Sequence, residues 1–257
     1  ITGEFKRTLW NPFVEAIEKY KLIKDGDRIA VCISGGKDSM LLARMLKMAK
    51  DYRLYDFSPE YIMMNPGYME RDMKQMEFNN LLFDIPVSYF STNVFDDVEE
   101  IGKNPCFFCS RMRRGHLYRK AKELGCNKIA LGHHYDDVIE TTLMSMLYGA
   151  QARTMLPVIK SDNIEDMKLI RPMYLIREDD INLWKNRNNL NFVKCACRLN
   201  TKDGGEDTMH LRIKKLIRDL TNENPAVPAN IFGSMSGIDL EHVLSYKIDG
   251  VTLSRLP

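Results

Sequence analysis

The stretch IAVCISGGKDSM, residues 29–40, decides the fold of this chain. Its first five residues are apolar and predict a buried strand, and the pattern of residues 41–46 predicts a helix. Gly35 and Gly36 between them let the main chain approach an anion, because N–H groups at a helix N-terminus point outward and the helix dipole favours negative charge. Lys37 adds a point charge. The stretch therefore predicts a phosphate-binding loop that differs from the Walker A pattern, with an ordinary tight turn as the alternative.

Strand and helix patterns alternate on both sides of this loop. Strands are expected at residues 61–64, 86–90 and 128–131, and helices at residues 10–23, 69–82, 111–124 and 135–148. This alternation predicts an α/β fold with a doubly wound parallel sheet, whose ligands bind at the carboxyl ends of the strands. Further along, we expect an edge strand at 170–173, helices at 177–187 and 207–221, and a loop-rich tail from residue 222.

The length of 257 residues suits one large α/β domain with small additions. We predict an N-terminal helix (1–25), a nucleotide-binding domain (26–200) and a C-terminal helix and tail (201–257). The net charge is only +2, so a nucleic-acid surface must come from a local cluster of charge. No apolar run reaches about 18 residues, and the charged first 20 residues do not resemble a signal peptide, so we expect a cytoplasmic protein without a membrane span.

A second motif, GHHYDD at residues 132–137, follows the strand expected at 128–131. It lies at the same edge of the predicted sheet as the phosphate loop. Carboxylates beside a nucleotide commonly hold Mg²⁺, which makes Asp136 and Asp137 candidate ligands. The alternative is a pair of helix-capping aspartates next to two structural histidines.

The six cysteines, without a signal peptide, argue against a disulfide framework. Cys32 and Cys126 read as small buried residues. The other four form two close pairs, Cys106 with Cys109 and Cys195 with Cys197. A C-x-x-C spacing lets two thiolates bind one metal centre from a single turn. Cys195 and Cys197 stand too close in sequence for both to reach one tetrahedral ion easily, and a site with one of them has an open position. The cysteine spacing is compatible with an iron–sulfur cluster, a zinc site or a redox pair.

The SGGKDS loop resembles the pyrophosphatase loop of the PP-loop ATPases, which split ATP into AMP and pyrophosphate. Together with PCFFCSRMRRG and GHHYDDVIET, in that order, it resembles the tRNA 2-thiocytidine synthetase family, and the segment at 230–235 resembles that family's tail. The similarity runs from about residue 5 to residue 240. Related tRNA 2-thiouridine synthetases usually carry additional zinc-binding C-x-x-C pairs at both ends, and this chain has none.

The resemblance implies a [4Fe-4S] enzyme that uses ATP and Mg²⁺. It would adenylate the C2 carbonyl oxygen of a cytidine at position 32 of the tRNA anticodon loop, and sulfur delivered through the open iron would then displace AMP. The implied partners are tRNA and a sulfur donor, either a cysteine desulfurase or sulfide, and we expect a homodimer. The alternatives are thiouridine synthesis or sulfur transfer to a small molecule on the same fold, and a non-catalytic nucleotide-binding module stapled by zinc.

Residue by residue, the resemblance places Asp38 close to the chemistry and assigns ATP binding to Ser34, Gly35, Gly36, Lys37, Asp38, Ser39, Met63, Met64, Gly132, His133 and Asp137. The two methionines also fit a plain core role. Cys106 and Cys109 match the cluster ligands. For the third ligand we favour Cys197, whose following residues fit the family context, over Cys195.

Basic side chains surround the expected cluster and continue on a later helix. They are Arg111, Arg113, Arg114, Lys120, Lys122, Arg212, Lys214, Lys215 and Arg218. Such groups supply most nucleic-acid affinity through phosphate contacts, although solvated helix faces have the same composition. The family position of Arg113 is basic and beside the cluster, so we predict that Arg113 stabilises charge on an adenylated base that is flipped out of the loop.

Overall fold

The computed structural model describes residues 1–101, 105–161, 164, 166–193 and 209–254, and of residues 105–107 only the main chain. The strands are β1 (Arg28–Ile33), β2 (Ser58–Asn65), β3 (Val87–Ser91), β4 (Lys128–Ala130), β5 (Val158–Lys160), β6 (Lys168–Ile170), β7 (Ser245–Ile248) and β8 (Val251–Ser254). The helices are α1 (Asn11–Tyr20), α2 (Lys37–Asp51), α3 (Glu70–Leu82), α4 (Val94–Ile101), α5 (Pro105–Glu123), α6 (Tyr135–Gly149), α7 (Glu178–Arg187), α8 (Met209–Glu223) and α9 (Val227–Ser234), with a π-helical turn at Lys6–Trp10 and a 3₁₀ turn at Leu240–His242.

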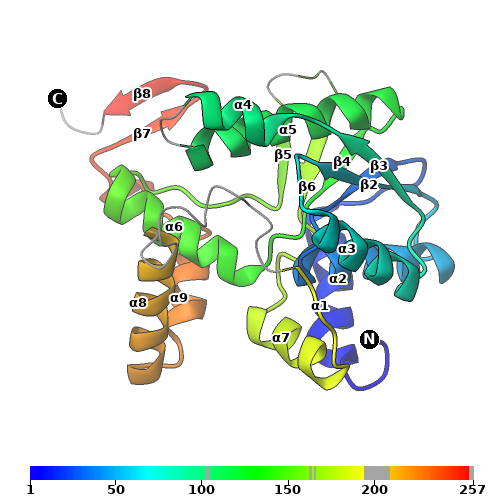
Figure 1. Cartoon of the computed structure of the whole chain (residues 1–257). Coiled ribbons are helices and arrows are strands. Elements are labelled where there is room, and N and C mark those ends of the chain that lie inside the picture. The colour runs from blue at the N-terminus through cyan, green and yellow to red at the C-terminus, as the bar shows by residue number, and fades with distance from the viewer. Residues whose placement is uncertain (102–104, 162–163, 165, 194–208, 255–257) are drawn as a thin grey trace. The chain divides into compact units, whose positions relative to one another are not determined.

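Six strands form the main sheet in the order β3-β2-β1-β4-β6-β5, and all neighbours are parallel except β5 and β6 (Figure 1). The chain winds outward from β1 through β2 to β3 and then returns to place β4 on the other side of β1. This reversal confirms the predicted doubly wound α/β fold. It also creates a crevice between the carboxyl ends of β1 and β4, which is where such folds bind ligands.

Alternate residues of β1 enter two different cores. Ile29, Val31 and Ile33 join the larger core with α1, α2, α3 and α7. Ala30 and Cys32 join a second core with α5 on the opposite face of the sheet (Figure 1). Cys32 and Cys126 are both buried there, as predicted, and burial raises the pKa of the Cys32 thiol to about 12. Helices on both faces explain why β1 is apolar at every position after Arg28.

A buried ion pair connects the start of the sheet to its centre. The Lys128 ammonium on β4 contacts Asp27 at 2.5 Å and donates a hydrogen bond to the Leu22 carbonyl at 2.8 Å. The Asp27 carboxylate also accepts from Asn127 and from the main chain of Lys24. Burial opposes the charge on Asp27, but these donors hold its pKa below the ordinary value.

The chain divides into two compact units, Ile1–Val138 with Leu156–Thr208, and Ile139–Met155 with Met209–Pro257. The first holds the six-stranded sheet. In the second, His210 lies 3.6 Å from Glu140, and β7 pairs with β8 in a hairpin. The domain boundaries near residues 25 and 200 stay predictions. No helix of the described residues has the length and apolar character needed to cross a bilayer.

The structure corrects three sequence expectations. The edge strand expected at 170–173 is instead β6, which ends at Ile170 and lies inside the sheet because β5 pairs antiparallel along its outer side. The tail is not simply loop-rich, since it contains α9 and the β7–β8 hairpin. Helix α4 was not predicted, and α5 begins at Pro105 rather than Arg111, so the C-x-x-C lies within the helix.

We expect Lys128→Met to destabilise the protein by about 3–5 kcal/mol, because it leaves the Asp27 carboxylate buried without its cation. Urea unfolding measures this loss. The double variant Asp27→Asn, Lys128→Met serves as the control and should lose less than the single variant. A single variant within about 1 kcal/mol of the wild type, the range of an exposed ion pair, would contradict this role for the buried pair.

Candidate active site

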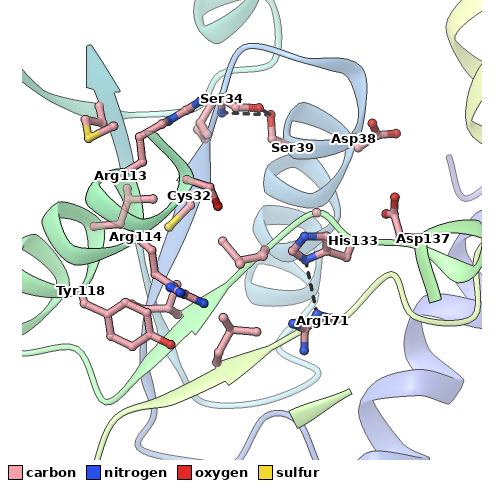
Figure 2. Close-up of a pocket in the computed structure, with 18 residues that line it drawn as sticks. Cys32, Ser34, Asp38, Ser39, Arg113, Arg114, Tyr118, His133, Asp137 and Arg171 are labelled. Atoms are coloured by element: carbon pink, nitrogen blue, oxygen red, sulfur yellow. Dashed lines mark hydrogen bonds between the residues drawn. The ribbon is translucent and has the colours of Figure 1, made fainter. Parts of the chain in front are cut away.

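A cavity of about 600 Å³ lies at the crevice between β1 and β4. Its walls come from the ends of these strands, the loop before α2, one face of α5 and the segment after β6 (Figure 2). The lining residues are Cys32, Ile33, Ser34, Asp38, Ser39, Met64, Ser110, Arg113, Arg114, Leu117, Tyr118, Ile129, Leu131, Gly132, His133, Asp137, Leu169 and Arg171. The volume falls within the range of small-molecule sites.

The phosphate loop is closed by the hydroxyl of Ser39. This hydroxyl donates to the Gly36 carbonyl at 3.0 Å, and it accepts from the Ser34 amide at 3.1 Å. Because its single proton is used on Gly36, the Ser34 hydroxyl must be the donor in the 3.1 Å contact between the two side chains. Gly36, the N-cap residue of α2, has no side chain that could cap the helix. Amide groups in the first turn therefore stay available for an anion.

Gly35 adopts a φ of +83°, which L side chains rarely adopt. A Cβ atom here would also come within 2.6–2.8 Å of the Met76 side chain of α3, which belongs to the larger core. The glycine is therefore required twice, once by the turn and once by the packing beneath it.

Lys37 is held by two carboxylates. Its ammonium lies 3.0 Å from Asp38 and 3.2 Å from Glu178 at the start of α7. Burial disfavours the charged form, but the two carboxylates outweigh it and raise the Lys37 pKa. Of the six loop residues predicted to bind ATP, Ser34, Asp38 and Ser39 line the cavity, whereas Lys37 is directed to this carboxylate pair.

The GHHYDD motif packs directly against the phosphate loop. A Cβ on Gly132 would meet the main chain of Asp38 and Ser39 at 3.0 Å, so this glycine permits the close approach. The His134 ring lies between two carboxylates, with Nε2 at 3.9 Å from Asp38 and Nδ1 at 3.5 Å from Asp137. Asp137 also accepts the His134 amide and lines the cavity.

Asp136 has a different environment from Asp137. Its carboxylate accepts a bifurcated hydrogen bond from Arg177 Nε, with both oxygens at 3.2 Å, one from Arg177 Nη2 at 3.0 Å, and one from the Glu178 amide at 2.7 Å. It therefore sits at the N-terminus of α7, where a negative charge is stabilising. Asp136 fixes α7, and through it Glu178, beside the phosphate loop.

One face of α5 forms the opposite wall of the cavity. Ser110, Arg113, Arg114, Leu117 and Tyr118 follow helical spacing and all line the cavity. Arg113 Nη2 donates to the Tyr68 hydroxyl at 3.2 Å, and the Tyr68 ring packs edge-on against Phe95 of α4. The predicted catalytic arginine is therefore positioned by a residue that the sequence did not single out.

The cysteine sites are described only in part. Cys109 is 8% exposed and packs in a small core with Val94, Phe95 and Val98 of α4. Cys106 belongs to the first turn of α5, but its side chain lies outside the described residues, as do Cys195 and Cys197. Two thiols one turn apart on a helix can reach one thiolate-bound centre. Within the described residues, no three His, Cys, Asp or Glu side chains converge on one point.

The two methionines have separate environments. Met64 lines the cavity, whereas Met63 is fully buried in the larger core. The sequence interpretation missed Arg171, Tyr118, Tyr68 and Glu178, which line the cavity or hold its residues in place. For Arg171 a signal existed, since it follows an apolar strand and the carboxyl ends of such strands form the site.

A doubly wound sheet with a glycine-rich phosphate loop at its switch point defines a nucleotide-binding α/β protein. Residues 5–202 match the model of the PP-loop domain. The tRNA-cytidine(32) 2-sulfurtransferase 1 of Francisella philomiragia is 36% identical over 93% of both chains. The tRNA-cytidine(32) 2-sulfurtransferase of Coxiella burnetii is 35% identical over 91% of both. The chain belongs to the tRNA-cytidine(32) 2-sulfurtransferase family of PP-loop proteins.

A solved structure shares the fold. It is the U34-tRNA thiolase NcsA from Methanococcus maripaludis with its [4Fe-4S] cluster, with a TM-score of 0.69 and 21% identity over 91% of this chain and 79% of that one. At this identity the likeness shows a shared fold.

We expect Gly35→Ala to destabilise the protein more than Gly26→Ala. Both glycines have similar positive φ values, +83° and +85°, so both variants incur the same backbone strain of about 1–2 kcal/mol. Only Gly35 has Met76 in the path of the new methyl group, which adds an overpacking cost of about 1–3 kcal/mol. Urea unfolding of both variants measures the difference. Equal losses would mean that Met76 moves aside freely.

Proposed function

We propose that this chain thiolates the cytidine at position 32 of tRNA in an ATP-dependent reaction. One observation carries the proposal: a single cavity is lined by Ser34, Asp38 and Ser39 of the phosphate loop and by the arginine-bearing face of α5 that begins at the C-x-x-C. The phosphate loop thus shares one cavity with α5, the helix whose first turns carry the C-x-x-C. The relatives named tRNA-cytidine(32) 2-sulfurtransferase, 35–36% identical over more than nine-tenths of the chain, supply the substrate.

In the first half-reaction the C2 carbonyl oxygen of the cytidine attacks the α-phosphorus of ATP. The new P–O bond forms as the bond to the bridging oxygen breaks, and pyrophosphate leaves with the electron pair. The α2 amide groups bind phosphate oxygens, while the hydroxyls of Ser34 and Ser39 hold the loop closed around them. Lys37, held by Asp38 and Glu178, adds positive charge to the loop. Arg113, oriented by Tyr68, stabilises charge on the adenylated base.

Mg²⁺ would neutralise part of the charge on the phosphates. Asp137 faces the cavity near Asp38 and is suited to this role, since both line the same wall. Asp136, the other predicted ligand, would first have to release Arg177 and the Glu178 amide. We therefore assign the metal to Asp137 before Asp136.

A [4Fe-4S] cluster would be held by Cys106, Cys109 and Cys197, with Cys195 as the alternative third ligand. The donor set fits such a group, because three thiolates leave one iron position open for an external sulfur. When bound, the cluster would supply the sulfur that replaces the activated oxygen. A cysteine desulfurase or free sulfide would provide that sulfur.

The remaining partners follow from the substrate. Exposed Arg111 and Arg114 on α5, and Arg212, Lys215 and Arg218 on α8, would contact tRNA phosphates. Because the substrate is tRNA, the reaction belongs in the cytoplasm. We also propose that the enzyme works as a homodimer.

We expect Asp38→Ala to reduce formation of 2-thiocytidine by at least about 10²-fold, as is typical when one electrostatic group is removed from an active site, while the iron content is unchanged. Mass spectrometry of nucleosides, after anaerobic incubation with tRNA, ATP and sulfide, measures the product. Asp51→Ala, at the exposed end of the same helix, is the matched control. An Asp38→Ala variant that thiolates tRNA as fast as the wild type would refute the assignment. If the wild type forms 2-thiouridine in place of 2-thiocytidine, the uridine alternative is correct.

Cysteine variants test the cluster. We expect Cys109→Ser to lose most iron and sulfide when purified anaerobically, whereas Cys126→Ser, an equally buried cysteine on the other core, keeps both. Cys197→Ala should behave as Cys109→Ser, and Cys195→Ala should not. If the anaerobically purified wild type is pale, contains zinc and lacks iron, the cluster hypothesis is wrong and the structural-zinc alternative is correct.

A further inference from the structure

Arg171 and His133 meet at the cavity wall, although 38 residues separate them. They follow the neighbouring parallel strands β6 and β4. Arg171 is 7% exposed, and its Nε lies 3.3 Å from His133 Nδ1, the contact drawn as a dashed line in Figure 2. Its Nη1 donates to the Leu156 carbonyl, which fixes the plane of the guanidinium.

The direction of this hydrogen bond determines where the imidazole proton resides. A guanidinium has only donors, so His133 Nδ1 must accept with its lone pair. A neutral imidazole carries one proton, which is then on Nε2. We propose that Arg171 locks His133 in the Nε2–H form and that this N–H donates to an anionic phosphoryl oxygen of the bound nucleotide. His133 is thus a hydrogen-bond donor and no general base, and Arg171 is its positioning residue.

The surroundings support a neutral ring. His133 lines the cavity beside the phosphate loop, and burial together with Arg171 lowers its pKa to about 4. The Arg171 pKa falls only to about 10, so Arg171 keeps its donor protons at neutral pH. His134 has a different environment from His133, because its ring lies between the carboxylates of Asp38 and Asp137 rather than against a cation. The two consecutive histidines therefore have different functions.

The chemistry also calls for a donor, and here the inference rests on the proposed function. A carbonyl oxygen attacks phosphorus without losing a proton, so adenylation gives a base nothing to remove. Negative charge on the phosphoryl oxygens must instead be stabilised, and a preorganised N–H in a closed site does so effectively. An imidazole fixed with its proton toward the cavity meets that requirement.

The tautomer is directly observable by NMR. In the full-length protein labelled with ¹⁵N-histidine, long-range proton–nitrogen spectra at neutral pH should show His133 with an unprotonated Nδ1 and a protonated Nε2. The chain has five histidines, and the loss of one set of signals in His133→Gln assigns the resonances. Arg171→Met should release the lock and populate the Nδ1–H form as well. A wild-type His133 with a protonated Nδ1, or with both nitrogens protonated, would overturn the proposal.

Two amide substitutions separate a donor from a base. The amide of His133→Gln places an N–H close to the Nε2 position, whereas the amide of His133→Asn reaches only the Nδ1 position. A hydrogen bond to a charged group contributes about 1.5–3 kcal/mol, so ATP should bind about 10–100-fold more weakly to the Asn variant than to the Gln variant. Calorimetric titration measures both, and thermal unfolding verifies that each variant folds.

Equal loss of ATP affinity in the two variants would contradict the donor role even if the tautomer is as expected. These measurements need no tRNA, so they are independent of the proposed function. If the wild type does not thiolate tRNA but shows the expected His133 tautomer and the expected ratio of ATP affinities between the Gln and Asn variants, only the proposed function is refuted. If the wild type thiolates tRNA but the His133→Gln and His133→Asn variants lose ATP affinity equally, only the donor role is refuted.

Discussion

The site depends on one steric constraint, the contact of Gly132 with the main chain of Asp38 and Ser39. A methyl group would come within 3.0 Å of both residues, so only glycine lets the end of β4 approach the start of α2 this closely. This contact closes the switch point of the sheet and brings the two nucleotide motifs to one cavity. Gly132 therefore packs the two motifs together and also lines the cavity, and the direct ATP contact that the resemblance implied stays a prediction.

Charge around the cavity is arranged in advance of substrate binding. Lys37 is held by Asp38 and Glu178, and Arg113 is held by the Tyr68 hydroxyl. Arg171 is fixed by the Leu156 carbonyl and His133. Side chains restrained in this way lose little freedom when a polyanion binds, and they need no reorganisation as charge develops in the reaction. Polar groups at the carboxyl ends of several strands and on α5 thus act as one preorganised electrostatic site.

The parts of the fold that the sequence predicted are those encoded locally. The apolar run of β1, the glycines of the loop and the helical pattern of α2 are contiguous and predicted the phosphate loop. Similar local patterns alternate along the chain and predicted the doubly wound sheet. Strand β5 was not predicted, since three residues carry too little pattern. Its pairing with β6 also moved that strand from the edge to the interior of the sheet.

For the site, too, the sequence predicted the residues that lie in local motifs and missed those whose role depends on distant contacts. Ser34, Asp38, Ser39 and Asp137 were found because they lie in motifs, and the structure places all four on the cavity wall. Arg171 and Glu178 were missed because their roles come from contacts across 38 and 141 residues of sequence. The end of an apolar strand marks the place of Arg171, but no local pattern names the residue that it or Glu178 contacts in the folded chain.

The central claim is that the cavity transfers AMP to the C2 oxygen of the cytidine before sulfur replaces that oxygen. The most direct test is an isotope measurement with a tRNA anticodon stem-loop that carries oxygen-18 at C2 of cytidine 32. After thiolation with ATP and sulfide, mass spectrometry should find the label in AMP and none in pyrophosphate. Thiolated product accompanied by unlabelled AMP, with the oxygen-18 in water or inorganic phosphate, would contradict the account.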